Sequence, residues 1–377
     1  VKRQYNGNRG KIENCVNSVA LSYSAPGFNV LLDAQLYLPE EWASDLERRR
    51  RAHIPDEVEF RTKPQIAMDL IDRALANGIR VLAWTADELY GQNAEFLNGL
   101  DTRDEAFVVE IPVDVRVWMM KPEILKHPPE NGDGRMKVFP RLARGARHPS
   151  EVRDLARYSP AFRKQTPQRY RIKDTHRGSE VWEIRWATCW RQTHDDRIVS
   201  NQCTLIVARN VLTGEVKYFL SNRVPNRDGW NVRKLLRVAF GRWPIEDCFR
   251  EAKEELGLDH FECRGWQCIH RHLHLSILSQ LFCARTRQEL SLNEDVLSGE
   301  LLTTEQVRRA ASVVVSTMTL PSKVRQRLFQ DEVDRQSYYA HRCAAASRSH
   351  RKQRRKQLAM LGINPEKIKS VFRSQPP

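Results

Sequence analysis

Residues 64–87, PQIAMDLIDRALANGIRVLAWTAD, combine a helix pattern with a strand pattern that follows it directly. The spacing of the apolar residues predicts one buried helix face within Pro64–Leu75, and Gly78 suits the end of that helix. The compact apolar run Ile79–Trp84 predicts a buried strand, and it leads into Asp87. The apolar helix positions are Ile66, Leu70, Ile71 and Ala74. A helix joined to a buried strand favours an α/β fold.

The segments on either side extend this pattern. Val19–Tyr23 and Asn29–Leu38 predict a hairpin before the helix, and Ala106–Ile111 predicts another strand after it. This order predicts a mixed α/β core whose second half is largely parallel. Four further segments predict a β-rich insertion, and helical patterns return after about residue 231. The four segments are Arg169–Ile172, Val181–Trp190, Thr204–Asn210 and Val216–Leu220.

The composition is that of a basic globular protein. The 377 residues include 62 Lys and Arg against 47 Asp and Glu, giving a net charge of +15, with 41% hydrophobic and 29% charged residues. These values exclude collagen, a fully disordered chain and a membrane bundle. No apolar run approaches the roughly 18 to 20 residues that span a bilayer, and the eight cysteines are scattered. We expect a cytoplasmic protein with reduced thiols and no membrane partner.

Much of the charge excess lies in the last 43 residues, which hold eleven Lys and Arg and one acidic residue. Arg348–Lys356 is the densest part, and as a helix it would be cationic on nearly every face. Such a helix suits a polyanion, of which DNA is the commonest. The residues expected to bind DNA are Arg351, Lys352, Arg354 and Arg355. The alternative is a solvated basic tail without a specific partner.

Residues 241–253, GRWPIEDCFREAK, bring a carboxylate and several cations together. Pro244 suits the first turn of a helix. Glu246, Arg250 and Lys253 then share one face, and Arg242 lies just before the helix. A carboxylate flanked by cations suits a divalent metal and a phosphate backbone. The alternative is an ion pair between Glu246 and Arg250 on a solvated helix.

A second candidate carboxylate, Asp87, lies at the end of the predicted buried strand. Ligands of open α/β sheets collect at the carboxyl ends of strands. The alternative for Asp87 is a helix cap or a loop acid.

Taken together, these motifs resemble a bacterial insertion-sequence transposase of the DDE type. That branch has a ribonuclease H-like core and a Tyr-Arg-Glu-Lys signature. The resemblance extends from Val1 to about Leu281. It rests on WTADELYG at 84–91, on the spacing of Arg242, Glu246 and Lys253, on RQYNG at 3–7, on LYLPEEW at 36–42 and on GLDH at 257–260.

The resemblance implies a ribonuclease H-like core interrupted by the β-rich insertion and followed by a basic helical region. The expected domains are residues 1–112 for the first part of the core, 113–232 for the insertion, 233–300 for the helix carrying Glu246, and 301–377 for the basic region. The implied activity is cut-and-paste transposition, in which the protein binds insertion-sequence ends and cleaves and transfers DNA strands. The implied partners are double-stranded DNA, as transposon ends and target, and a second copy of the chain on that DNA.

The resemblance also implies roles for single residues. Three carboxylates would hold two Mg²⁺ (or Mn²⁺) ions, with Asp87 as the second carboxylate and Glu246 as the third. Arg242 and Lys253 would hold the DNA backbone, and Arg250 would contact DNA from the same helix face. An aromatic residue of the insertion would stack on a flipped base. Trp182, Trp186 and Trp190 share a strand face, although such a stripe is more often core packing.

The sequence departs from the family pattern at two places. Ala239 occupies the position where the signature has Tyr. The first carboxylate is expected on a strand that would precede Val1, so we expect an N-terminally truncated chain. The alternative function is therefore a non-catalytic DNA-binding relic of a transposase. A third possibility is an RNA-binding protein unrelated to nucleases.

Overall fold

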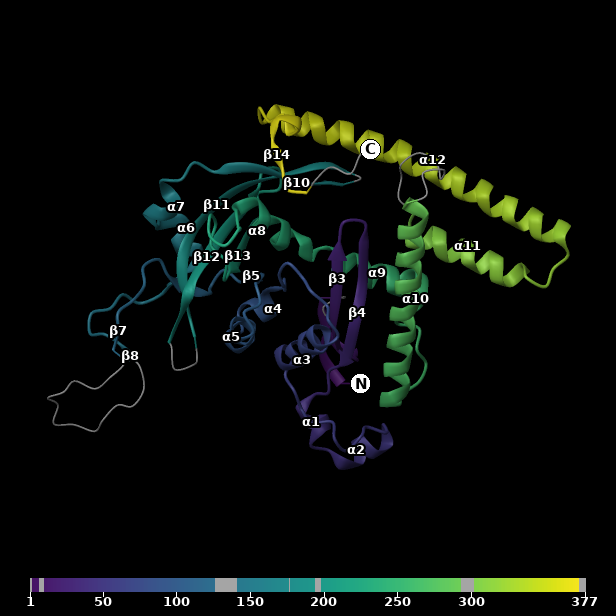
Figure 1. Cartoon of the computed structure of the whole chain (residues 1–377), viewed down its shortest axis with the longest axis horizontal. Helices are drawn as coiled ribbons and strands as arrows, with labels where there is room; N and C mark the ends of the chain where they lie inside the picture. Colours follow the sequence, from purple (N-terminus) through teal and green to yellow (C-terminus); the bar gives the residue numbers. More distant parts are fainter. Residues whose placement is uncertain are drawn as a thin grey trace. The chain divides into compact units, whose positions relative to one another are not determined.

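A computed structural model describes residues 2–6, 10–125, 141–175, 177–193, 198–292 and 302–372 (Figure 1). The chain forms two compact units, each built from segments distant in sequence. Unit 1 contains Val1–Arg80 and Trp243–Ala344, and unit 2 contains Val81–Arg242 and Ala345–Gln375. Helices and strands occur in both, which confirms the predicted mixed α/β class.

Unit 1 is built on the antiparallel hairpin of β3 and β4, as the sequence predicted. A second hairpin, β1–β2, precedes it. The elements are β1 (Lys2–Asn6), β2 (Lys11–Cys15), β3 (Ser18–Ala25), β4 (Phe28–Leu36), α1 (Glu40–Ala43), α2 (Leu46–Arg51), α3 (Lys63–Ala76), α9 (Pro244–Leu256), α10 (Trp266–Leu292), α11 (Thr304–Thr317) and the first part of α12 (Ser322–Met360).

Helix α3 packs against the β3–β4 hairpin through the face that its sequence pattern predicts. Its N-terminus carries a capping box: the Thr62 hydroxyl accepts from the Gln65 amide at 3.4 Å, and the Gln65 side chain accepts from the Thr62 amide at 3.0 Å. The buried residues of the helix are Ile66, Leu70, Ile71 and Ala74. The predicted helix and its apolar face are confirmed.

Strand β4 and helices α9 and α10 share one core, whose polar centre is Gln280. This side chain is only 2% exposed. Its oxygen accepts the Leu31 amide at 3.0 Å, and its amide donates to the Cys248 carbonyl at 2.9 Å. The apolar members of the core are Leu31, Ala34, Leu36, Cys248, Ala252, Leu258, Ile269, Leu273 and Ile277. Gln280 therefore links β4, α9 and α10 within that core.

Unit 2 is dominated by a sheet in the strand order β14-β10-β11-β12-β13-β5, with β6 paired to β11 and β9 paired to β6 (Figure 1). The strands of unit 2 are β5 (Val108–Ile111), β6 (Arg116–Trp118), β7 (Ile124–Leu125), β8 (Arg141–Leu142), β9 (Ser150–Glu151), β10 (Gln168–Thr175), β11 (Gly178–Gln192), β12 (Val199–Asn210), β13 (Val216–Ser221) and β14 (Lys369–Ser370), of which β7 and β8 form a separate two-stranded sheet. Its helices are α4 (Glu88–Gly91), α5 (Ala94–Thr102), α6 (Val152–Tyr158), α7 (Pro160–Arg163), α8 (Val232–Ala239), the 3₁₀ turns η1 (Phe240–Arg242) and η2 (Pro365–Lys367), and the end of α12.

The four strands predicted for the insertion are confirmed as β10 to β13. The sheet that they form extends to β5, which pairs antiparallel with β13. The expectation of a largely parallel second half concerned the core segments 79–84 and 106–111, and these meet in parallel at one bridge between Trp84 and Phe107. Among the described strands, the other parallel pairing is that of β14 with β10.

The prediction of a buried strand over Ile79–Trp84 is wrong in its extent. Only Trp84 forms a bridge, and Leu82 is 48% exposed. Apolar character alone does not make a strand, because each strand also needs a partner for its backbone groups. In the described part of the chain, residues 79–83 belong to no strand ladder.

Among the described residues, none of the helices combines the length and the apolar character that a membrane span requires.

We expect Gln280→Leu to lower the free energy of unfolding by about 2 kcal/mol, because the buried Leu31 amide loses its acceptor. Urea unfolding, with hydrogen exchange of β4 as a local probe, measures the effect. Gln288→Leu is the matched control, since Gln288 is exposed on the same helix. Equal losses in both variants would contradict a central role for Gln280.

Candidate functional site

Asp87 is positioned by backbone pairing to β5. The Trp84 amide donates to the Ala106 carbonyl at 2.8 Å, and the Val108 and Glu110 amides donate to the Trp84 and Ala86 carbonyls at 2.9 and 3.0 Å. Asp87 follows this pairing and is the N-cap of α4, where its Oδ1 accepts from the Leu89 amide at 3.0 Å. The cap expected as an alternative role is therefore present, and it engages one carboxylate oxygen.

Helix α4 lies unusually close to β5. A Cβ on Gly91 would stand 2.0 Å from the Glu110 carbonyl oxygen, so only glycine allows this approach. The neighbouring Tyr90 ring packs on Phe96, with 5.4 Å between ring centroids. Burial, followed by the charge of Asp87, raises the pKa of the Tyr90 hydroxyl, which therefore stays neutral at physiological pH. These contacts fix the helix that Asp87 caps.

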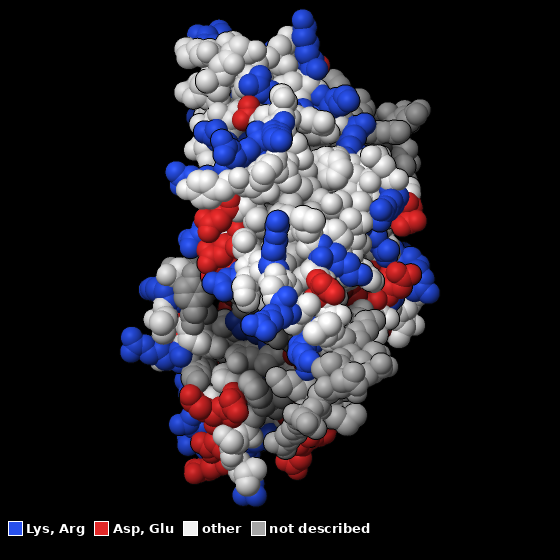
Figure 2. Space-filling model, turned by 90° about the vertical axis from the view of Figure 1, so that its left-hand side faces the viewer, with Lys and Arg blue, Asp and Glu red and all other residues white. Residues whose placement is uncertain are grey.

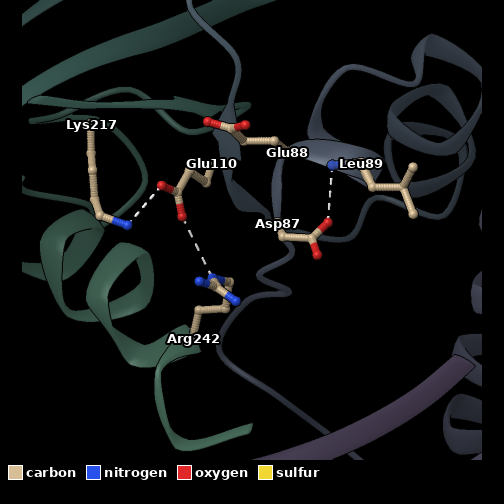
Figure 3. Close-up of a pocket in the computed structure, with 6 residues that line it drawn as sticks. All are labelled: Asp87, Glu88, Leu89, Glu110, Lys217 and Arg242. Carbon is tan, nitrogen blue, oxygen red and sulfur yellow. Dashed lines mark hydrogen bonds and ion pairs between the residues drawn. The ribbon is translucent and has the colours of Figure 1, made fainter. Parts of the chain in front are cut away.

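A pocket of about 390 Å³ opens beside Asp87, and all of its lining residues belong to unit 2 (Figure 3). Glu110 accepts from Lys217 Nζ at 2.8 Å and lies 3.6 Å from Arg242 Nε. The Glu110 side chain is 12% exposed, and those of Arg242 and Lys217 are 20% and 21% exposed. The pocket is lined by Asp87, Glu88, Leu89, Glu110, Lys217 and Arg242. One half-buried carboxylate thus holds two cations at the pocket wall.

The pocket's carboxylates differ in their fitness for a divalent metal. Within the described residues, Asp87 Oδ2 and the exposed Glu88 carboxylate have no hydrogen-bond or ion-pair partner. Carboxylate oxygens are the donors that Mg²⁺ prefers. Glu110 is neutralised by two cations and is unsuited to the role. The part of the chain that the structure describes contains no cluster of three or more His, Cys, Asp or Glu arranged for a metal.

Glu246 lies in the first turn of α9, in unit 1, and is exposed. The other faces of the helix are committed to packing: Cys248 and Ala252 are buried, and Glu251 and Glu255 bind Thr304 and Arg308 of α11. The face with Glu246, Arg250 and Lys253 takes no part in these contacts. On that face Glu246 and Arg250 are exposed, and Lys253 is half-buried.

The alternative expected for Glu246 was an ion pair with Arg250, but Arg250 pairs with two other carboxylates of α9. Arg250 donates to Asp247 at 3.1 Å and to Glu254 at 3.3 Å. Burial lowers the pKa of Arg250, but the bonds and charges of Asp247 and Glu254 outweigh it and raise the pKa overall. The Lys253 ammonium lies 5.9 Å from the centre of the Phe249 ring. Arg250 is therefore largely neutralised within its own helix.

Ala239, at the position of the signature Tyr, is buried with 3% exposure. The next residue, Phe240, packs on Trp182 and Phe219, with centroid distances of 5.1 and 5.3 Å. Trp182 is 4% exposed, so this member of the tryptophan stripe serves core packing. The local core explains why this turn offers no hydroxyl group.

The basic C-terminal part of α12 docks onto the sheet of unit 2. Leu358 is fully buried with Val181 and Ile363, and Arg354 lies against Gly178. Arg351, Lys352 and Arg355 are exposed, and Arg355 pairs with Glu366 at 3.3 Å. Lys and Arg side chains predominate at the upper end of Figure 2, level with this end of α12 and β14 in Figure 1. The predicted basic helix is confirmed, and its cations face outward.

Sequence reasoning did not identify Glu110 and Lys217. A usable signal was present for Glu110, because it is the one charged residue within the apolar run Ala106–Ile111. A charge on a buried strand calls for a partner. Lys217 carried no comparable signal, since a lysine near a strand end is ordinary.

Comparison with known proteins places the chain near the transposases. Residues 1–179 match the family model of DDE superfamily endonucleases, a segment that includes Asp87 and ends before Arg242 and Glu246. A probable transposase for insertion sequence element IS701, from Microchaete diplosiphon, is 33% identical over 112 residues. This alignment covers 29% of the chain and 27% of that relative. The resemblance stated from the sequence is confirmed.

We expect Glu110→Gln to lower the stability of unit 2 by roughly 2 kcal/mol, because Arg242 and Lys217 would lose their shared anion. Thermal unfolding monitored by circular dichroism measures the loss. Glu215→Gln is the matched control: Glu215 also approaches Lys217, at 3.8 Å, but is 52% exposed. That variant should change stability by less than about 0.5 kcal/mol. A loss in the control as large as in Glu110→Gln would contradict the assignment.

Proposed function

We propose that the chain is a DDE-type transposase that binds insertion-sequence ends and cleaves and transfers DNA strands in a divalent-metal-dependent reaction. The observation that carries this proposal is Asp87, which lies within the matched family segment and lines the pocket of unit 2. Its free oxygen and the cations beside it suit a phosphodiester substrate. The transposase relative supports the same reaction class.

In this proposal Asp87 and Glu246 are the catalytic carboxylates and the metal ligands. Asp87 offers Oδ2 while its other oxygen stays bound to the Leu89 amide, which fixes the orientation of the carboxylate. Two Mg²⁺ or Mn²⁺ ions would activate the attacking hydroxyl or water and stabilise the departing oxygen.

The cations have a separate task, which is to hold the DNA backbone. Arg242 has a planar guanidinium suited to phosphate oxygens. Its ion pair with Glu110 would hold that guanidinium in place. Arg250, which is exposed, and Lys253, which is half-buried, lie on the face of α9 that carries Glu246. Because Asp247 and Glu254 neutralise much of the Arg250 charge, we expect Lys253 to contribute more to phosphate binding than Arg250 does.

The exposed cations at the end of α12 would bind the backbone of the same duplex away from the reacting phosphate. Arg351, Lys352 and Arg355 are exposed and supply this surface, and half-buried Arg354, which lies against Gly178, adds its charge. Cutting an element at both ends requires two reaction centres, so the proposal places one copy of the chain on each end. Light scattering of the DNA complex measures this stoichiometry.

We expect the chain to nick linear DNA carrying the element's ends when Mg²⁺ is present, and Asp87→Asn or Glu246→Gln to abolish nicking. Both changes keep the shape of the side chain and remove a metal-binding charge. The measurement is strand cleavage on denaturing gels, with DNA affinity determined in parallel. Affinity should persist in both variants.

Two exposed acids provide the controls for these two variants. Glu95→Gln changes an exposed acid in the first turn of α5, outside the pocket lining, and Asp247→Asn changes the residue next to Glu246. Both should leave cleavage within a few-fold of the unmodified chain. Cleavage that survives Asp87→Asn and Glu246→Gln would refute the assigned roles. DNA binding without any cleavage would favour the non-catalytic alternative, and a preference for RNA would favour the third reading.

Removing two exposed cations from the end of α12 should weaken DNA binding in a salt-dependent manner. For Arg351→Gln with Lys352→Gln, the slope of log affinity against log salt should fall by about 2, because each phosphate contact releases about one counterion. Fluorescence anisotropy at several salt concentrations measures the slope. Lys323→Gln with Arg327→Gln removes the same charge from the other end of α12 and should change it less. Equal changes would show that only net charge matters.

A further inference from the structure

Two of the eight cysteines, Cys263 and Cys268, lie together at the start of α10 in unit 1. Cys263 is half-buried and Cys268 is exposed. Their thiol groups hydrogen-bond to each other, and this bond raises the pKa of the Cys263 thiol more than its burial or the charge of Cys268 does. Such a bond favours protonated Cys263, so Cys263 donates and the Cys268 sulfur accepts. Neither residue belongs to the proposed catalytic or DNA-binding set.

The segment between α9 and α10 is fixed on both sides of Cys263. Before it, the Phe261 ring packs on the His272 ring, with 5.8 Å between ring centroids. After it, the Trp266 amide donates to the Ala52 carbonyl at 2.8 Å. Phe261, Cys263 and Trp266 all pack against the core shared by β4, α9 and α10. The fold of unit 1 therefore holds the Cys263 side of the pair in place.

The Cys268 side is held by the bend that opens α10. A Cβ on Gly265 would lie 4.0 Å from the Cβ of Cys268, so the bend lies directly against the first helical turn. The Ile269 amide donates to the Gly265 carbonyl at 3.0 Å, which begins the helix at this point. Bend and first turn thus bring Cys268 back toward the segment that carries Cys263.

The neighbouring histidines are engaged elsewhere. His270 Nε2 accepts from the Leu36 amide at 3.3 Å, and His272 Nε2 donates to the Gly257 carbonyl at 2.7 Å. Within the described ranges, no three His, Cys, Asp or Glu side chains are arranged to hold a metal ion. The two thiols therefore form a pair without further ligands, and thiol–disulfide exchange suits such a pair better than metal binding.

Access sets this pair apart from another pair of facing cysteines in the chain. Cys189 and Cys203 are direct partners across β11 and β12, but they are 0% and 1% exposed. Buried thiols of this kind are inert unless the sheet opens. Cys268 meets solvent on the first turn of α10, and Cys263 is half-buried. The pair at α10 is therefore the accessible one.

We propose that Cys263 and Cys268 are a redox-active dithiol that reduces a small anionic disulfide of the glutathione class and becomes an internal disulfide. Exposed Cys268 is the attacking sulfur, and Cys263 completes the exchange. Arg264 and Arg271, both exposed, lie on either side of Cys268 in sequence. With Glu262 as the acid of the same segment, positive charge prevails over residues 262–271 and attracts an anionic reagent. The inference goes beyond the proposed function and does not depend on it.

The reaction consists of two exchanges. The Cys268 sulfur, as a thiolate, attacks one sulfur of glutathione disulfide, whose S–S bond breaks as one glutathione thiolate leaves. The Cys263 thiol then gives up its proton, and its sulfur attacks the Cys268 sulfur, which forms the internal S–S bond and releases the second glutathione. The two leaving thiolates take up the two protons of the protein thiols. Two protein thiols are thereby oxidised to one disulfide, and one glutathione disulfide is reduced to two thiols.

Trypsin cleaves between the two cysteines at Arg264, which makes the linkage directly visible. In the reduced chain Cys263 belongs to the tryptic peptide 254–264 and Cys268 to the peptide 265–271. The full chain is incubated in glutathione buffers without DNA or metal, alkylated and digested. We expect mass spectrometry to find the two peptides joined by a disulfide. Excess reduced glutathione should reverse the linkage.

Cys343, the exposed cysteine of α12, is the internal standard for a lone thiol. The linked peptides should form at a glutathione disulfide concentration about tenfold below the one that modifies Cys343, because a thiol held nearby acts at a high effective concentration. The chain unfolded in urea should lose much of this advantage. Equal sensitivity of the pair and Cys343, or an equal yield of linked peptides in urea, would overturn the inference.

Serine variants separate the two roles and keep the side-chain shape. Cys263→Ser should stop at a mixed disulfide between Cys268 and glutathione, whereas Cys268→Ser should leave Cys263 largely unmodified. Cys343→Ser is the matched control and should not change the yield of linked peptides. Circular dichroism verifies the fold of each variant. Glutathione addition to Cys263 in Cys268→Ser that is as fast as addition to Cys268 in Cys263→Ser would overturn the assigned order of attack.

The outcomes separate this inference from the proposed function, because the readout uses the protein thiols alone. A chain that neither binds nor cleaves DNA would still give the linked peptides. Their absence would overturn the dithiol and leave the roles of Asp87 and Glu246 untouched.

Discussion

The candidate site of unit 2 depends on three backbone hydrogen bonds between residues 84–86 and residues 106–110. They hold a short segment parallel to β5, although that segment forms no full strand. The pairing ends at Ala86, so Asp87 leaves the ladder and caps α4. Gly91 then lets α4 lie against β5 at a distance that no side chain would permit. The position of the carboxylate follows from backbone geometry, with little help from its own side chain.

The acidic groups of the pocket divide two tasks that a single carboxylate could not perform together. Glu110 is saturated by Lys217 and Arg242, so it arranges positive charge and cannot also bind a cation strongly. Asp87 keeps one oxygen available. The pocket thereby holds a free carboxylate beside a guanidinium without the two neutralising each other. Such a separation suits a reaction in which one group binds metal and the other binds phosphate.

Much of the local structure could be predicted because it depends on local rules. The α3 helix, its capping box and its buried face follow from a pattern within fourteen residues. The β10 to β13 strands follow in the same way from alternation and turn residues. The run Ile79–Trp84 could not be judged by that method, because a strand requires a partner and the partner is distant in sequence. Glu110 and Lys217 were missed for the same reason: their bond joins residues 107 positions apart.

The neighbours of each cation, more than the number of cations, determine which of them can meet a polyanion. Arg49 donates hydrogen bonds to backbone carbonyls. Arg250 pairs with Asp247 and Glu254, and Arg355 pairs with Glu366. Arg351 and Lys352 have no ion-pair partner in the part of the chain that the structure describes. Helix α12 is anchored there by Leu358 and by Arg354 at Gly178, so its attachment uses almost none of its outward charge. Unneutralised charge held on a docked helix favours a phosphate backbone, because neutralising it releases counterions without ordering the helix anew.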